Sequence, residues 1–405
     1  MKTLFNLPKK IIFCKKCVTS NQRPCSYPEF NHRKERINAS YLHIDKEGIC
    51  DACNVAEEKQ NIDWVKRRKE LTKLLDKYRS KNGDYDCIVP GSGGKDSVYA
   101  AYVLKYEYGM NPLTVTWPPI LYTEYGYKNF LNWINIGGFD NITYKQNGRV
   151  MRMLTKLSIK NLFHPFQTFV LGQKNIPPLL AKKFNIPLVL YGENEAEYGN
   201  PKKNMSLSQR ENKYFSSKNY DNIYLAGLSL KKLQAKYNLS VKDLKPFLPL
   251  TNKEVIKSKL AVHYLGYYLK WIPQEAYYFA VDKTNFQPRP FRTEGTYSKY
   301  NSIDDKIDDL HYYCTFIKFG IGRATHDASQ EIRNKHITRE EGKNLVKKFD
   351  GEFPKRYFDE VLDYLQIQKS EFEKICNSFR SPHIWKKTKK GFKLRHTVNG
   401  DGVDD

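Results

Sequence analysis

The stretch that decides the fold lies at residues 86–97 and reads DCIVPGSGGKDS. Apolar residues at 87–89 are typical of a buried parallel strand, and residues 97–108 follow a helical pattern. The glycines at 91, 93 and 94 allow a tight turn that brings backbone N–H groups close to an anion. A strand that leads through such a loop into a helix N-terminus is predicted to bind phosphate.

Two common phosphate-binding patterns do not fit this loop. The Walker pattern needs a hydroxyl residue after its lysine, whereas Lys95 is followed by Asp96. The dinucleotide pattern needs a glycine where Asp96 stands. Residues 92–97, SGGKDS, resemble instead the SGGxDS signature of the PP-loop ATP pyrophosphatases, in which the loop holds the β- and γ-phosphates of ATP. The alternative is an ordinary glycine-rich turn between a strand and a helix.

Apolar strand patterns alternate with helix patterns after the loop. Such alternation predicts βαβ units and a doubly wound parallel α/β sheet, here of the PP-loop ATP pyrophosphatase type. We expect strands at 112–117, 141–144, 186–191 and 262–271. Ligands of such sheets bind at the carboxyl ends of the strands. Thr116 closes the second strand, where the resemblance to PP-loop enzymes implies that the adenosine of ATP lies, so it is predicted to contact the adenosine.

Carboxylates also follow a strand end, at Glu193, Glu195 and Glu197. Oxygen ligands near a triphosphate suit Mg²⁺, and Glu193 is the preferred candidate. The alternative for Glu195 and Glu197 is an acidic first turn of a helix, which the helix dipole favours. Residues 200–250 are polar and irregular, and we interpret them as an insertion over the mouth of the active site, with the features of a mobile lid.

Two C-x-x-C pairs lie near the N-terminus, Cys14 with Cys17 and Cys50 with Cys53. Eight cysteines in a chain of 405 residues favour metal ligation in a reducing compartment over a disulfide framework. Four thiolates fill a tetrahedral zinc site and leave no open position, so the predicted zinc is structural. Cys25 is not counted as a ligand, and two unrelated pairs are the alternative.

The chain is expected to divide into four parts. They are a zinc-ribbon module at 1–62, a linker helix at 63–83, an ATP pyrophosphatase domain at 84–290 that carries the insertion 200–250, and a helical C-terminal region at 291–405. The longest apolar runs are far short of a membrane span, and residues 1–6 are not followed by a signal-type apolar segment. We therefore expect a cytoplasmic protein without a membrane partner.

The formal net charge of +24 raises the question of nucleic-acid binding. Basic residues are spread along the chain rather than gathered in one stripe, so a nucleic-acid partner is not expected. The dense exception is KKTKKGFKLRH at 386–396. We interpret it as a solvated, partly disordered basic tail, and docking to an acidic protein is the alternative.

Polar residues are concentrated in the C-terminal region. The acidic run at 304–309 is interpreted as a solvated helix face. Gly320 and Gly322 precede Arg323 and are interpreted as a close backbone approach to an anion. The guanidinium of Arg323 offers two parallel donors to a phosphate or carboxylate. Arg323, Arg292 and Lys299 are therefore the predicted contacts to the substrate.

Seven segments together extend a resemblance over nearly the whole chain. They are the two cysteine pairs, PGSGGKDS at 90–97, YGENEAEYG at 191–199, YLKWIPQE at 268–275, RTEGTYSKYNSIDDKIDDLHYY at 292–313 and FGIGRATHDASQEIR at 319–333. These segments resemble the bacterial N-acetyl sugar amidotransferases of surface-polysaccharide (lipopolysaccharide) and flagellin-sugar biosynthesis. Cys25 is an addition to that pattern.

The resemblance implies an ATP-dependent, AMP-forming ligase that turns the acetamido group of a nucleotide-linked or nonulosonic-acid sugar into an acetamidino group. Ser92, Gly93, Gly94 and Ser97 would hold pyrophosphate, and Asp96 would bind Mg²⁺. Lys95 would add positive charge or point to solvent. The implied partners are a separate glutaminase and a cyclase-like subunit that passes ammonia.

A glutaminase needs a nucleophilic cysteine with a base. Cys87, Cys314 and Cys376 stand in apolar or helical contexts, so external ammonia is expected. The rival is a PP-loop enzyme that modifies tRNA by thiolation or lysidine formation. Thiolation needs a reactive cysteine pair after the loop, which Cys314 and Cys376 do not form in sequence, whereas lysidine formation stays open.

Overall fold

The central element of the fold is a five-stranded parallel sheet, described from a computed structural model for residues 2–33, 40–193 and 207–405. The strand order is β3-β2-β1-β4-β9. The strands are β1 (Cys87–Pro90), β2 (Pro112–Thr116), β3 (Asn141–Thr143), β4 (Leu188–Tyr191) and β9 (Ala261–Tyr264). All pairs within this sheet are parallel. The predicted mixed α/β class with a parallel central sheet is confirmed. The predicted site residues Glu195 and Glu197 lie outside the described residues.

The strand order places a switch point beside β1. From β1 the chain adds β2 and β3 on one side, and β4 then pairs with the other side of β1. At such a point the two neighbouring crossover connections diverge and leave a crevice at the carboxyl ends of the strands. The glycine-rich loop follows β1 and therefore opens into that crevice.

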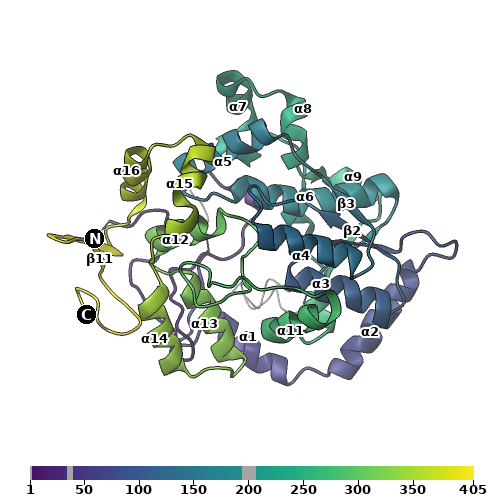
Figure 1. The fold of residues 1–405 in the computed structure, drawn as a ribbon, viewed down its shortest axis with the longest axis horizontal. Coiled ribbons are helices and arrows are strands. Elements are labelled where there is room, and N and C mark those ends of the chain that lie inside the picture. Colours follow the sequence, from purple (N-terminus) through teal and green to yellow (C-terminus); the bar gives the residue numbers. More distant parts are fainter. Residues whose placement is uncertain (1, 34–39, 194–206) are drawn as a thin grey trace.

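Helices cover both faces of the sheet (Figure 1). One face, with Cys87 and Val89 of β1, packs against α2 (Trp64–Tyr78), α3 (Lys95–Tyr102), α4 (Glu124–Asn135) and α11 (Pro273–Thr284). The other face, with Ile88 of β1, packs against α5 (Gly148–Leu162) and α6 (Gln167–Phe184). Successive residues of β1 thus face opposite cores, which explains why the strand is apolar throughout.

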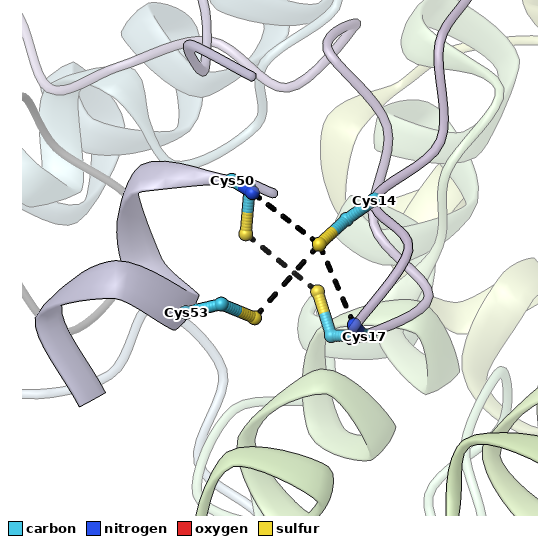
Figure 2. Close-up of side chains that lie close together, drawn as sticks. All are labelled: Cys14, Cys17, Cys50 and Cys53. Atoms are coloured by element: carbon cyan, nitrogen blue, oxygen red, sulfur yellow. Dashed lines mark hydrogen bonds between the residues drawn. The ribbon is translucent and has the colours of Figure 1, made fainter. Parts of the chain in front are cut away.

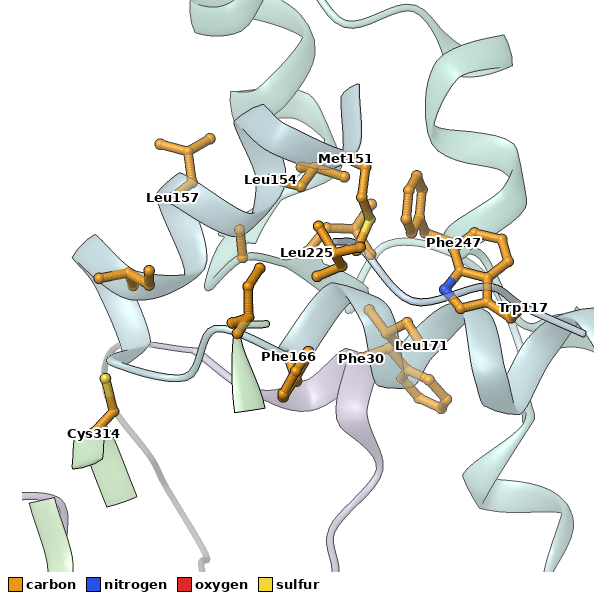
Figure 3. Packing of buried hydrophobic residues seen from close by; sticks show 14 of the residues in the cluster. Phe30, Trp117, Met151, Leu154, Leu157, Phe166, Leu171, Leu225, Phe247 and Cys314 are labelled. Carbon is orange, nitrogen blue, oxygen red and sulfur yellow. The ribbon is translucent and has the colours of Figure 1, made fainter. Parts of the chain in front are cut away.

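The described part of the insertion is packed rather than loose. It holds η5 (Asn212–Tyr214), β5 (Ser216–Ser217), β6 (Tyr224–Leu225), β7 (Leu228–Ser229), α7 (Leu230–Tyr237), α8 (Val241–Leu244), η6 (Lys245–Phe247) and β8 (Leu250–Thr251). Leu225 and Phe247 lie in the same core as α5 and α6, and the Phe247 ring packs edge-on against Trp117 at 5.6 Å between centroids (Figure 3). For residues 207–250, burial of these apolar side chains holds the segment on the core in this structure, and its role as a mobile lid stays a prediction.

The strand predicted at 262–271 is shorter than expected. β9 ends at Tyr264, and α10 (Leu265–Tyr268) follows directly. At this turn the Gly266 N–H donates to Gly192 O at 2.8 Å. This hydrogen bond ties the segment to the residue after β4. The helix predicted after the loop begins at Lys95 and continues as a π-helix, η2 (Val103–Glu107).

The C-terminal region is helical, as predicted. It consists of α12 (Asp308–Phe319), α13 (Arg323–Arg333), α14 (Arg339–Phe349), α15 (Lys355–Leu365) and α16 (Lys369–Phe379). Apolar residues of α12, α15 and α16 extend the core that lies against α5 and α6. This region is therefore packed onto the sheet domain, and both chain termini lie beside it (Figure 1).

The basic segment at 386–396 is ordered, which corrects the interpretation as a partly disordered tail. Strands β10 (Trp385–Thr388) and β11 (Gly391–Leu394) form an antiparallel hairpin. Trp385 anchors it, because the buried indole N–H donates to Ile317 O at 2.8 Å. Within the described chain, no helix is both long and apolar enough to cross a lipid bilayer.

The acidic run at 304–309 is not a solvated helix face. Asp305, Asp308 and Asp309 are all buried. Asp305 accepts hydrogen bonds from the backbone N–H groups of Ile120 at 2.6 Å and Ile307 at 2.9 Å. The apolar residues Ile303 and Ile307 draw this segment into the core, and the intervening carboxylates are buried with it.

Candidate active site

Gly93 gives the loop after β1 its shape. Its φ of +84° lies in the left-handed region, and a Cβ there would approach Phe130 Cα to 2.6 Å. Only glycine fits at this position without strain. Gly94 is the N-cap residue of α3 with an ordinary φ of −68°, so the loop delivers the chain directly into a helix N-terminus.

Lys95 and Asp96 form an ion pair at the start of α3. Lys95 is only 8% exposed and its Nζ donates to Asp96 Oδ2 at 2.6 Å, so this lysine does not point to solvent. The other carboxylate oxygen, Asp96 Oδ1, is buried and has no hydrogen-bond partner among the described residues. Burial of a carboxylate oxygen without a hydrogen-bond donor costs free energy. We therefore expect a ligand or a cation to contact Asp96 Oδ1.

A cavity of about 440 Å³ lies over the loop. Ser92, Gly93, Gly94, Lys95 and Asp96 line it together with Asn129, Gln173, Glu193, Tyr300, Asn301, Ser302, Asp304, Arg323, His326 and Gln330. The structure thus brings most of the residues predicted for the nucleotide site, and Arg323, to one polar cavity. Ser97 supports the loop from behind, because its hydroxyl donates to Gly94 O at 2.8 Å.

Asp304 belongs to this cavity, although the sequence interpretation did not assign it. Its Oδ2 accepts a hydrogen bond from Ser92 Oγ at 2.9 Å. Gly126 makes this approach possible, because a Cβ at Gly126 would lie 2.3 Å from Asp304 Cα. The signal in the sequence was Ile303 directly before the acidic run, which indicates a buried rather than a solvated segment.

Three predicted site residues lie elsewhere among the described residues. Thr116 is fully buried, and its hydroxyl accepts from Asn141 Nδ2 at 2.9 Å within the sheet. Arg292 forms a two-pronged ion pair with Glu352, at 2.5 and 2.6 Å. Lys299 is exposed. None of the three lines the cavity over the loop, so their roles stay predictions.

Arg323 begins α13 and is held by two partners. Its Nε contacts Asp327 Oδ1 at 2.8 Å, and a terminal nitrogen donates to the Tyr312 hydroxyl at 3.0 Å. Burial opposes the charge, but Asp327 and Tyr312 outweigh it and hold the pKa of Arg323 above its ordinary value. Burial lowers the pKa of neighbouring His326 to about 3, so this imidazole is neutral at physiological pH.

A second cavity, of about 480 Å³, adjoins the first. Arg323 and His326 line both cavities, so the start of α13 forms their common wall. The cationic side chains that line the second cavity are Arg23, Arg33, Lys174, Lys318 and Arg323. Glu29 is the one carboxylate among its described lining residues, so this cavity favours an anionic ligand.

The four cysteines of the N-terminal pairs converge (Figure 2). Cys14 Sγ lies 3.9 Å from Cys53 Sγ, and Cys17 Sγ lies 3.7 Å from Cys50 Sγ. These separations fit the edges of about 3.8 Å expected for a tetrahedron with Zn–S bonds of about 2.3 Å. All four are buried and free of disulfides, and they could hold a zinc ion.

Local hydrogen bonds prepare this cluster for a cation. Backbone N–H groups of Lys16 and Cys50 donate to Cys14 Sγ at 3.4 and 3.3 Å. Hydrogen bonds from the side chains of Cys17, Cys50 and Cys53 lower the pKa of the Cys14 thiol. Donors that favour a thiolate are typical of the surroundings of a structural zinc site.

The C-terminal part of the chain matches a known family. Residues 294–398 match the family described as LPS biosynthesis protein WbpG-like, C-terminal domain. This match supports a role in lipopolysaccharide or sugar biosynthesis. The matched residues include Asp304, Arg323 and His326, which line the cavity over the loop.

One curated protein is similar over a short stretch. It is an uncharacterized protein of Methanocaldococcus jannaschii, 35% identical over 74 residues. The match covers 18% of this chain and about a quarter (26%) of that protein's length. The name of that protein gives no activity, so the similarity adds no function.

Proposed function

We propose that this protein is an ATP-dependent amidotransferase that converts the acetamido group of an N-acetylated, nucleotide-linked sugar into an acetamidino group. The observation that carries the proposal is the unpartnered Asp96 Oδ1 beside the glycine-rich loop, at the switch point of the sheet. A phosphate loop of the PP-loop type would place ATP in the cavity over that loop. The match to lipopolysaccharide biosynthesis proteins supports the sugar class of the substrate.

The loop would bind the pyrophosphate part of ATP. Gly93 and Gly94 leave room for a phosphate at the N-terminus of α3, and Lys95 adds a buried positive charge. Asp96, Asp304 and Glu193 offer carboxylate oxygens that would hold Mg²⁺, which would neutralise charge on the phosphates during transfer.

The second cavity would bind the sugar substrate. Its cationic walls suit the phosphates of a nucleotide-linked sugar, and it meets the ATP cavity at Arg323 and His326. Binding there would direct the acetamido oxygen toward the α-phosphate of ATP. The guanidinium of Arg323, fixed by Asp327, would then lie where negative charge develops.

An amide oxygen is a poor leaving group, so ammonia displaces it only after activation. Attack of that oxygen on the α-phosphorus would form an O-adenylyl imidate and release pyrophosphate. Ammonia then adds to the imidate carbon, a proton is lost, and AMP leaves to give the acetamidino sugar. ATP is thus converted to AMP and pyrophosphate, the acetamido oxygen leaves with AMP, and no step requires an oxidant.

Ammonia is proposed to come from a separate glutaminase through a cyclase-like subunit. Burial raises the pKa of the Cys376 thiol to about 12 and raises those of Cys87 and Cys314 as well. Such thiols are poor nucleophiles. Together with the four cysteines of the zinc cluster, this leaves buried Cys25 as the remaining thiol, which also lacks the exposure a glutaminase nucleophile needs.

The test is pyrophosphate release by the full chain with ATP, Mg²⁺, ammonium chloride and a panel of N-acetylated nucleotide sugars. Asp96→Asn is expected to lower kcat/KM by about 100-fold or more, because it removes a charge at the phosphates. Asp76→Asn, on the exposed face of α2, is the matched control and should retain activity. Glutamine-dependent turnover without any partner would refute the ammonia source, and retained activity in Asp96→Asn would refute the site.

The rival proposal, tRNA modification, rests on the net charge of +24 and the zinc-type cysteine cluster. It predicts a shift of tRNA in a native gel at physiological salt that weakens steeply as salt rises. The sugar amidotransferase predicts pyrophosphate release that depends on the sugar and is unchanged by added tRNA. The two assays together separate the proposals.

A further inference from the structure

Three potential metal ligands, distinct from the cysteine cluster, meet in the second cavity. Glu29 lies in η1 (Glu29–Asn31), His32 follows it directly, and His164 lies in the turn between α5 and α6. One ligand atom from each of the three lies within 4.8 Å of the others. All three residues line the cavity of about 480 Å³.

The Glu29 carboxylate lies in contact with both imidazoles. Glu29 Oε1 lies 3.2 Å from His164 Nε2, and Glu29 Oε2 lies 3.3 Å from His32 Nδ1. The first contact also has the geometry of a hydrogen bond, so the metal measurement below decides between the two arrangements. The two imidazole nitrogens face different oxygens of Glu29, so one ion between them would be bound by both carboxylate oxygens.

The donor set is two imidazole nitrogens and one carboxylate, a combination that binds divalent first-row ions. The Glu29 side chain is 8% exposed, whereas the side chains of His32 and His164 are 16% and 22% exposed. Three protein ligands leave one coordination position for a small molecule. That position would face the interior of the cavity.

We propose that Glu29, His32 and His164 form a second metal site, for a divalent ion of the zinc class with one open position. Lys174 and Lys318 line the same cavity, and their positive charges disfavour a metal ion whose positive charge is not neutralised by an anion. The open position is therefore expected to hold an anionic group, either hydroxide or an oxygen of the ligand that occupies the cavity. This site goes beyond the proposed amidotransferase function and does not depend on it.

Metal content tests this proposal directly. The full chain, purified without a polyhistidine tag, is saturated with zinc sulfate, dialysed, and its zinc is counted by mass spectrometry. Wild type is expected to retain about two zinc ions per chain, one in the cysteine cluster and one in the second site. Glu29→Gln and His164→Ala are each expected to retain one. His311→Ala is the matched control, because His311 stacks on His164 at 5.2 Å but is not a ligand, and it should retain two.

Cobalt(II) substitution keeps the test independent of folding defects. Cobalt in the cysteine cluster gives intense thiolate charge-transfer bands, whereas cobalt bound by nitrogen and oxygen gives only weak visible bands. A variant that keeps the thiolate bands and loses the weak bands is folded and lacks only the second site. A wild type that binds a single ion after saturation, or Glu29→Gln and His164→Ala variants that bind two, would overturn the proposal and leave a hydrogen-bonded His–Glu–His group.

Discussion

At the scale of single residues, two neighbouring glycines of the loop have different roles. Gly93 needs its positive φ and has Phe130 Cα and Asn129 O where a Cβ would lie. Gly94 has an ordinary φ, and a Cβ there would meet nothing closer than Ser92 Oγ at 3.9 Å. The sequence motif does not distinguish them, whereas the backbone does.

Gly93→Ala is expected to lower the free energy of unfolding by at least about 2 kcal/mol, because it combines a left-handed residue with a backbone clash. Gly94→Ala should change it by less than about 0.5 kcal/mol. Urea unfolding followed by circular dichroism measures both. Equal stabilities for the two variants would show that the loop adopts another conformation.

Arg289 and Asp309 form a buried pair behind the cavity. Their side chains are 0% and 2% exposed, and the closest nitrogen and oxygen are 4.0 Å apart. Burial raises the pKa of Asp309 to about 7, although Arg289 opposes this shift. A buried guanidinium that loses its carboxylate carries an uncompensated charge.

Asp309→Ala is therefore expected to destabilise the fold by about 3–5 kcal/mol at pH 8, where Asp309 is ionised. The double variant Arg289→Met with Asp309→Ala should recover most of the loss, because no charge is then left unpaired. Thermal and urea unfolding of the three proteins gives the comparison. Additive losses in the double variant would mean that the two side chains are not coupled.

At the scale of elements, α13 joins the two cavities. Asp350 fixes its start, since its carboxylate accepts from Gly322 N–H at 2.9 Å and Thr325 N–H at 3.1 Å. This arrangement holds Arg323 and His326 in the common wall. The edge strand β9 carries His263, whose Nδ1 lies 2.8 Å from the Tyr268 hydroxyl.

Burial lowers the pKa of His263 to about 4, with a smaller contribution from Lys77. Below pH 6.5 the unfolded chain binds a proton at this residue and the folded chain does not, so stability falls as pH drops from 6.5 toward 4. This residue contributes up to about 3 kcal/mol to that loss. His263→Gln should flatten the stability profile in this window, whereas exposed His336→Gln should not. Parallel profiles for wild type and His263→Gln would contradict the assignment.

At the scale of the whole molecule, the two ends of the chain hold one another. Arg339 of α14 donates to Cys14 O and Cys17 O, each at 3.2 Å. The Nε2 atom of His383 lies 3.0 Å from Gln22 Oε1, and the Leu4 N–H donates to Ser381 Oγ at 2.9 Å. The cysteine module is therefore part of the packing of the C-terminal region.

Removal of zinc should loosen both regions together. A chelator, or Cys50→Ser, is expected to lower Tm and to open α13 and α14 to hydrogen exchange along with residues 10–60. Cys25→Ser, a buried thiol outside the cluster, is the control and should keep the exchange pattern of wild type. If exchange rises in residues 10–60 alone, the contact through Arg339 does not couple the regions.

The sequence by itself determined the class of fold and the position of the glycine-rich loop after its first strand. Apolar runs such as 87–89, followed by glycines and a helix pattern, report local backbone preferences and burial, which depend on nearby residues. The cysteine pairs were equally readable, because ligand spacing is a local property.

Only the tertiary structure decided which distant side chains share a cavity. Asp304 meets Ser92, and Glu29 and His32 meet His164, because core packing and sheet order bring together segments that are far apart in the chain. It also buried the acidic run and paired Arg292 with Glu352. Charge and polarity in a sequence do not reveal whether water or a partner side chain satisfies them, since that depends on the whole packed molecule.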